Sequence, residues 1–145
     1  MRESTVLGIG VAVVSMLVLL SAVHVYWALG GQLGKGAVLP ERNGQPVCQP
    51  GAAATVVVAI ALLGAAVVLA LRAGVLSYLI GGPAVHWASW MVAAAFLLRS
   101  IGDFRWVGFF RRERGTRFAY WDARLYTPLA FALGLGAGAI AWGAT

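Results

Sequence analysis

Four apolar stretches divide the chain, and each is long enough to cross a membrane as a helix. They run over residues 6–28, 52–72, 83–101 and 124–143. An α-helix rises about 1.5 Å per residue, so about 20 apolar residues cross a hydrocarbon core of about 30 Å. The pattern therefore predicts an all-α fold, an integral membrane four-helix bundle in a single domain.

Polar and breaker residues mark the ends of these stretches. Tyr26 and Trp27 close the first as interfacial aromatics, and Gly30 and Gly31 then stop the helix. A secretory signal peptide is the alternative for this stretch, but no A-x-A-like cleavage site follows, so we expect a span. The 30–50 connection either folds over the bundle or is mobile, and residues 75–80 are too short to cross and are expected at the interface.

Composition supports the membrane assignment. The chain is 61% hydrophobic and 11% charged, with a mean hydropathy of +0.83, whereas soluble domains carry about a quarter charged residues. The net charge is +6, and the basic residues lie beside the apolar spans, where they usually set the orientation in the membrane. We therefore expect no nucleic-acid partner. Cys48 is the single cysteine, which excludes an internal disulfide, and no zinc or di-iron spacing occurs, so we expect no metal and no cofactor. Arginine dominates the basic residues, as is typical of a GC-rich bacterial genome.

The polar stretch 99–128 holds seven of the eleven basic residues. Four spans place both termini on one side of the membrane and the 30–50 and 102–122 connections on the other. Arg2 and Arg72 fall on the first side, and the other nine basic residues fall on the second. The positive-inside rule predicts a bacterial cell membrane protein with its termini outside and its arginine-rich loop in the cytoplasm.

The same connectivity collects a polar constellation at one membrane face, and we treat it as the candidate site. Its members are His24, Tyr26, Arg99, Asp103, Arg105, Asp122, Arg124 and Tyr126. Ionisable groups near hydrocarbon tend to pair with one another. Asp103 follows the carboxyl end of the third helix, where the dipole disfavours an anion, so we expect a cation beside it, from Arg99 or Arg105. A structural ion pair and a substrate-facing group are both open.

Two members of the constellation, Asp122 and His24, have alternative interpretations. Asp122 either belongs to the site or caps the fourth helix, which Thr127-Pro128 would also start. His24 is either a hydrogen-bonded packing residue or a proton carrier. His86 starts the third helix at the opposite face, roughly 20 Å away, so a haem held between the two histidines is not expected.

Two further patterns concern contacts with lipid and with other helices. The run Arg111, Arg112, Arg114 and Arg117 sets orientation, and it also suits a contact with anionic lipid headgroups or an acidic partner. Gly134 and Gly138 form a G-x-x-x-G in the fourth span, and such small residues mark a helix-packing face. Packing within the monomer and homo-oligomerisation through this face are the two interpretations.

Three segments resemble the signature of the bacterial DUF3995 family of small four-span membrane proteins, whose function is unassigned. They are H-V-Y-W-A-L-G-G (24–31), R-S-I-G-D-F-R-W-V-G-F-F-R-R (99–112) and F-A-Y-W-D-A-R-L-Y-T-P-L (118–129). The resemblance covers nearly the whole chain and implies no catalytic residue. It implies that the motif positions are His24, Tyr26, Trp27, Gly30, Gly31, Gly102, Asp103, Arg105, Gly108, Asp122 and Tyr126.

These observations favour a non-catalytic bundle that binds a lipid or a partner membrane protein through its polar, arginine-rich cytoplasmic face. The chain has no evident nucleophile–base pair, metal set or cofactor loop. The alternative is a membrane-embedded enzyme or carrier for a small amphiphilic or anionic substrate, using His24, Asp103 and Asp122. A deep cavity ending at His24 and Asp103 would favour the alternative, and a dry, fully paired cluster would favour the binding module.

Overall fold

Four long helices make up most of the chain. The computed structural model describes residues 3–42, 45–47, 49–76 and 82–143. In chain order the elements are α1 (Glu3–Ala28), α2 (Lys35–Val38), β1 (Glu41–Arg42), β2 (Gln45–Pro46), α3 (Ala52–Arg72), α4 (Pro83–Ile101), α5 (Arg117–Trp121), the π-helical turn η1 (Asp122–Tyr126) and α6 (Thr127–Gly143). The last three form one continuous helix, and within the described residues four helices are long and apolar enough to cross a membrane. The predicted all-α membrane bundle is confirmed, and the chain is a multi-pass membrane protein.

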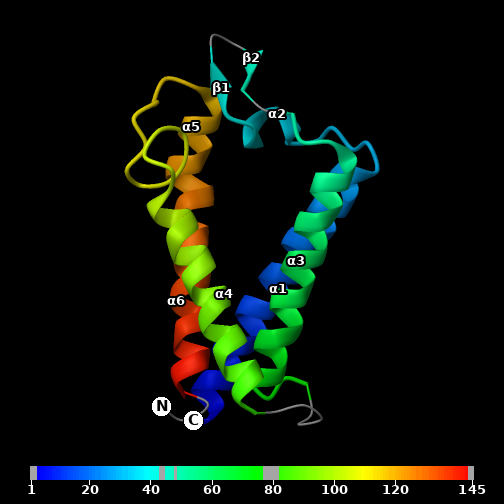
Figure 1. Cartoon of the computed structure of the whole chain (residues 1–145), viewed down its shortest axis with the longest axis vertical. Helices are drawn as coiled ribbons and strands as arrows, with labels where there is room; N and C mark the ends of the chain where they lie inside the picture. The colour runs from blue at the N-terminus through cyan, green and yellow to red at the C-terminus, as the bar shows by residue number, and fades with distance from the viewer. Residues whose placement is uncertain (1–2, 43–44, 48, 77–81, 144–145) are drawn as a thin grey trace.

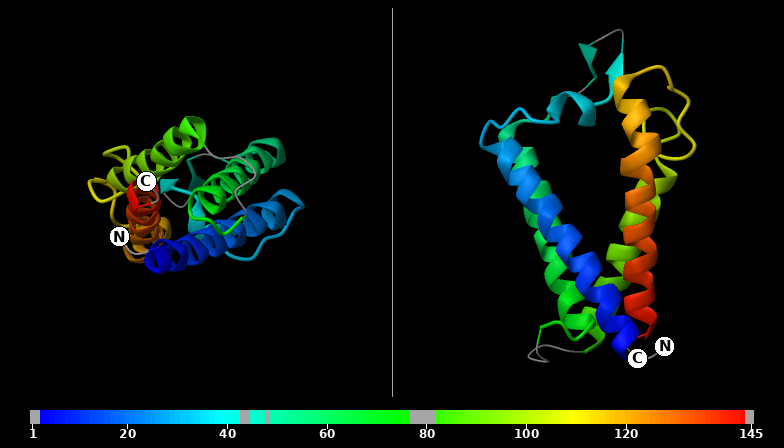
Figure 2. Two further views of the ribbon diagram at one scale, coloured as in Figure 1. Left: turned by 90° about the horizontal axis from the view of Figure 1, so that it is seen from below. Right: turned by 180° about the vertical axis from the view of Figure 1, so that it is seen from behind.

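The helices pack as two pairs, α1 with α3 and α4 with α6. The pairs meet at the end where both chain termini lie, and they diverge toward the opposite end (Figures 1 and 2). At the open end the 30–50 connection folds across between the pairs, and its short helix α2 lies against α5. The strands β1 and β2 form a two-residue antiparallel hairpin above it, with Glu41 opposite Pro46.

Small residues let the helices approach closely in the core. A Cβ atom added at Gly134 would lie 2.8 Å from the side chain of Leu97 on α4, and one added at Gly138 would lie 3.9 Å from Ala93. The prediction that both glycines face another helix is therefore confirmed, and that helix is α4 of the same chain. Gly136 faces the other way, toward Val13 of α1. The small-residue face thus packs the monomer.

Many large apolar side chains lie on the outside of the helices. Leu19, Ile60, Met91 and Trp142 are each more than half exposed. Such residues would be costly in water, whereas lipid chains solvate them, and the backbone polar groups are satisfied within each helix. The exposed apolar surface is therefore that of a protein surrounded by lipid.

The fourth spanning helix begins earlier than its apolar stretch indicates. It starts at Arg117, and Thr116 is the N-cap, whose hydroxyl oxygen accepts a hydrogen bond from the Ala119 N–H at 3.1 Å. Neither Asp122 nor Thr127-Pro128 starts this helix, because both lie within the continuous run from Arg117 to Gly143. The expected interfacial segment 75–80 lies largely outside the described residues, and Arg2 and Cys48 lie outside them as well.

Candidate functional site

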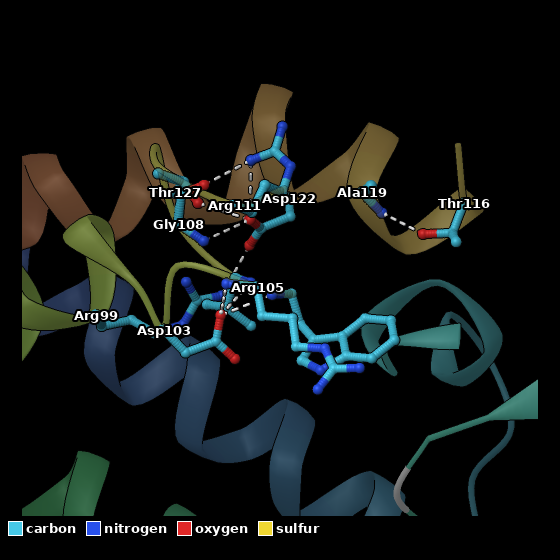
Figure 3. A network of polar contacts seen from close by, with 11 residues as sticks. Arg99, Asp103, Arg105, Gly108, Arg111, Thr116, Ala119, Asp122 and Thr127 are labelled. Atoms are coloured by element: carbon cyan, nitrogen blue, oxygen red, sulfur yellow. Dashed lines mark hydrogen bonds and ion pairs between the residues drawn. The ribbon is translucent and has the colours of Figure 1, made fainter. Parts of the chain in front are cut away.

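Asp122 is the centre of the polar contacts at the open end of the bundle. Its side chain is completely buried. Oδ1 accepts a hydrogen bond from Arg99 Nη2 at 2.8 Å. Oδ2 accepts from the Gly108 N–H at 3.0 Å, from Arg111 Nη1 at 3.2 Å and from the Thr127 hydroxyl at 2.9 Å (Figure 3). We call these five residues the Asp122 network. It joins α4, the 102–116 connection and the fourth spanning helix at one carboxylate.

The π-helical turn explains how Asp122 and Thr127 come together. In a regular α-helix, residues five apart point in clearly different directions. In η1 the Thr127 N–H donates to the Asp122 carbonyl, a bond between residues five apart, and the wider turn brings the two side chains to one face. Pro128 follows immediately and has no N–H, so the regular ladder of hydrogen bonds cannot run through this point.

Two glycines shape the loop that supplies Gly108 and Arg111. Gly102 and Gly108 both have φ near +90°, and their backbones cross closely. A Cβ atom on either glycine would overlap backbone atoms of the segment that holds the other. Beside this crossing, the Phe109 N–H donates to the Ser100 carbonyl at 2.8 Å. The crossing directs the Gly108 N–H to the Asp122 carboxylate, which explains why both positions need glycine.

Asp103 holds the same loop from the other side, and its role differs from the prediction. Its Oδ1 accepts hydrogen bonds from the backbone N–H groups of Arg105, Trp106 and Val107 at 2.7–2.9 Å. Burial acts to raise the pKa of the carboxyl, but these three N–H groups outweigh it and hold the pKa below its ordinary value. Among the described residues, Asp103 makes no ion pair with Arg99 or Arg105. The backbone N–H groups of the loop therefore stabilise the Asp103 carboxylate in place of the expected arginine.

The Asp122 network has the character of a structural junction. The Asp122 carboxylate is fully enclosed, the side chain of Arg111 is 12% exposed and that of Arg99 is 37% exposed. Removing one partner of such a buried pair costs about 3–5 kcal/mol, because the remaining charge is left uncompensated. The network therefore fixes the 102–116 connection to the helices that flank it.

The other polar residues of the fourth helix and the loop lie outside the network. The guanidinium of Arg124 stacks 3.8 Å from the ring centroid of Tyr120, and that of Arg105 lies 5.1 Å from the ring of Trp106. The ring of Tyr126 packs beside Phe118, with centroids 6.2 Å apart. The side chains of these three residues contact aromatic rings and not the Asp122 carboxylate.

His24 and Tyr26 belong to the other helix pair, so the expectation that His24 joins Asp122 in one cluster is wrong. His24 Nδ1 donates to the Leu20 carbonyl at 2.8 Å, and its ring lies edge-on to Trp27. The Tyr26 hydroxyl accepts from the Leu33 N–H at 3.3 Å, and Trp27 Nε1 donates to the Leu33 carbonyl. These contacts shape the turn after α1.

Two open pockets flank α2, and neither reaches the predicted acid–base residues. One of about 440 Å³ is lined by Gln32, Lys35, Gly36, Leu39 and residues 49–51. The other, of about 310 Å³, is lined by Gly36, Leu39, Glu41, Pro46 and Arg117. Within the part of the chain that the structure describes, no three His, Cys, Asp or Glu side chains gather as a metal site.

Comparison with known proteins places the chain in a family. The profile of DUF3995, described as a protein of unknown function, matches residues 17–137. The chain belongs to the DUF3995 family. No curated protein and no solved structure matches it. In this DUF3995 protein the matched range contains both the Asp122 network and the turn after α1.

Sequence reasoning left Arg111 and Thr127 out of the candidate site, and it gave Gly108 only as a motif position of the family. Arg111 was grouped with the exposed arginines, although its guanidinium is held by Asp122 and the Gly108 carbonyl. The pair of glycines Gly102 and Gly108, separated by a short polar and aromatic segment, was the available signal for a tight backbone crossing.

Proposed function

We propose that this DUF3995 protein is a non-catalytic membrane module that binds anionic phospholipid headgroups. The binding element is the basic surface, which we define as Arg105, Arg112, Arg114, Arg117 and Arg124. One observation carries the proposal: among the described residues, none of these five arginines forms an ion pair with a carboxylate. A group of unneutralised cations beside membrane-spanning helices is complementary to an anionic lipid surface.

The acids of the 102–116 connection and of the fourth spanning helix do not neutralise this surface. Asp122 is buried and already paired with Arg99 and Arg111. Asp103 is engaged by backbone N–H groups. Glu113 is exposed and makes no ion pair within the described residues. Each arginine close to an anionic leaflet contributes about 1 kcal/mol of attraction, so five of them give a substantial electrostatic contribution.

Aromatic residues beside the arginines support a position at the membrane interface. Phe104 and Phe110 are 56% and 62% exposed, and their ring centroids lie 6.1 Å apart. Exposed aromatic rings next to arginines are typical of segments that lie at the level of the lipid headgroups. Phe109 is 49% exposed, and its ring meets Phe131 of α6 edge-on at 5.8 Å. The exposed rings of this loop thus suit a position at the membrane interface.

The proposal assigns the Asp122 network a supporting role. A flexible loop would lose conformational entropy on binding a headgroup, which weakens affinity. The network and the Gly102–Gly108 crossing hold the loop in one conformation before any ligand arrives. This arrangement fits an orientation in which the basic surface lies at the cytoplasmic leaflet of a bacterial cell membrane and the termini lie outside.

The alternative, an enzyme or carrier that uses His24, Asp103 and Asp122, has less support. The three side chains are engaged in separate contacts, and His24 lies on the other helix pair. Neither pocket beside α2 is lined by any of them. An acid–base mechanism needs its groups within hydrogen-bond reach of one substrate position, and these contacts do not supply such a position.

Identification of bound lipid by native mass spectrometry tests the proposal. The protein is purified gently from bacterial membranes, and adducts are compared between the natural chain and a variant with Arg112→Gln, Arg114→Gln and Arg117→Gln. We expect anionic phospholipid adducts on the natural chain and clearly fewer on the variant. Arg42→Gln, a cation of β1 on the same side of the bundle, is the matched control. A bound partner protein with no enrichment of anionic lipid would contradict the proposal.

A further inference from the structure

A second polar contact lies at the closed end of the bundle, where the two helix pairs meet. Arg72 is the last residue of α3, and His86 lies in the first turns of α4. Arg72 Nη2 lies 3.1 Å from His86 Nδ1 and 3.0 Å from the carbonyl oxygen of Ala141 on α6. The contact therefore joins the α1–α3 pair to the α4–α6 pair.

The chemistry of this contact fixes the state of the histidine. A guanidinium is always protonated and only donates hydrogen bonds, and Nη2 carries two hydrogens. One hydrogen is directed to the Ala141 carbonyl, and the other is directed to His86. His86 Nδ1 must therefore be unprotonated and accept the bond, which places the ring hydrogen on Nε2. The contact requires a neutral imidazole.

We propose that Arg72 and His86 form an acid-sensitive clamp that holds the two helix pairs together. Protonation of the imidazole adds a hydrogen to Nδ1, the atom that accepts the bond from Arg72. The acceptor is then lost, and a second cation faces the guanidinium inside a partly buried contact. Because the contact requires a neutral imidazole, acidification weakens this clamp.

Among the described residues, the surroundings of His86 provide little to balance such a charge. Arg72 is the charged side chain in contact with it, and its Nε is buried without a hydrogen-bond partner among the described residues. The rings of Trp87 and Trp90 lie edge-on at 5.6 and 6.5 Å. The sequence of α6 contains no titratable side chain, and Arg99 lies at the far end of α4. Glu3, the acid at the start of α1, makes no ion pair within the described residues.

Thermal unfolding in detergent at pH 7.5 and pH 5.5, at constant ionic strength, tests the clamp. The chain has two histidines, so two variants separate their effects. We expect the natural chain and His24→Gln to lose about 3 °C or more of Tm on acidification. We expect His86→Gln to keep the same Tm at both pH values, because the glutamine carbonyl oxygen accepts from Arg72 throughout. The proposal is overturned if the natural chain has the same Tm at both pH values. It is also overturned if the Tm of His86→Gln falls on acidification as much as that of the natural chain.

A spectroscopic measurement keeps the test decisive if His86→Gln does not fold. The variant His24→Gln leaves His86 as the only histidine, so its ring nitrogens are assigned in a nitrogen-15 NMR spectrum without further mutation. We expect the Nε2–H tautomer at neutral pH. A ring that carries its hydrogen on Nδ1 at neutral pH contradicts the clamp, because that nitrogen could not accept a bond from Arg72.

Discussion

Arg99 Nη2 lies 2.8 Å from Oδ1 of Asp122, although 23 positions separate the two residues along the chain. The bond links α4 to the fourth spanning helix across the 102–116 connection. Because the carboxylate is completely buried, its charge depends on Arg99 and Arg111 for compensation. The contact is thus where the loop, the two helices and the basic surface are fixed relative to one another.

Removal of the Asp122 charge is expected to destabilise the fold. Asp122→Asn keeps the size of the side chain but leaves two guanidinium groups without their anion, at a cost of about 3 kcal/mol or more. Thermal unfolding of the purified protein in detergent measures the effect. Glu113→Gln is the control, because it removes an exposed carboxylate of the same loop that makes no ion pair within the described residues. Equal unfolding temperatures for Asp122→Asn and the natural chain would show that the network is not structural.

The Asp103 turn is expected to weaken in acid. Backbone N–H groups lower the pKa of this carboxyl in the folded state, so its ionised form contributes stability at neutral pH. That contribution is full above the ordinary aspartate pKa of about 3.9 and is lost as the pH falls through the lower folded value. Asp103→Asn should therefore be less stable than the natural chain at pH 7, with the difference shrinking below about pH 4. A difference that is independent of pH would mean that the charge has no role.

The glycine face of α6 is expected to reject a larger side chain. Gly134→Leu must separate α6 from α4, because Leu97 already occupies the space beside Gly134. We expect a loss of several kcal/mol in detergent, of the size seen when well-packed cores are overfilled or opened. Gly64→Leu on α3 is the matched control, since no atom outside its own helix backbone and chain neighbours lies within 4 Å of a Cβ atom at that position. Similar losses for both variants would contradict the packing assignment.

Labelling of Cys48 tests the orientation. This single thiol belongs to the 30–50 connection, which lies on the same side as the basic surface. With that side in the cytoplasm, a membrane-impermeant maleimide should label Cys48 only after the cells are opened. Labelling in intact cells would place the arginine-rich side outside, against the positive-inside rule.

Much of the fold could be predicted from the sequence because spans depend on local composition. Long apolar runs gave the four helices, and the spacing of Gly134 and Gly138 gave their packing face. The start of the fourth helix at Arg117 was missed, because its first turns are polar and aromatic and so do not continue the apolar pattern.

The candidate site was only partly predictable, because connectivity fixes depth in the membrane and not position within its plane. His24 and Asp122 were expected together since their helices reach the same face, but the helix pairs diverge toward that face. The partners of Asp122 depend on the Gly102–Gly108 crossing and on the π-helical turn before Pro128. Both are backbone features that no hydrophobic pattern records.

Thermal unfolding in lipid nanodiscs tests the central claim most directly. The natural chain and the variant with Arg112→Gln, Arg114→Gln and Arg117→Gln are compared in nanodiscs of phosphatidylcholine alone and with added phosphatidylglycerol. The account predicts that phosphatidylglycerol raises the Tm of the natural chain by several degrees, that salt weakens the effect, and that the variant largely loses it. Arg42→Gln should behave as the natural chain does. An equal Tm for the natural chain in both lipid compositions would contradict the account.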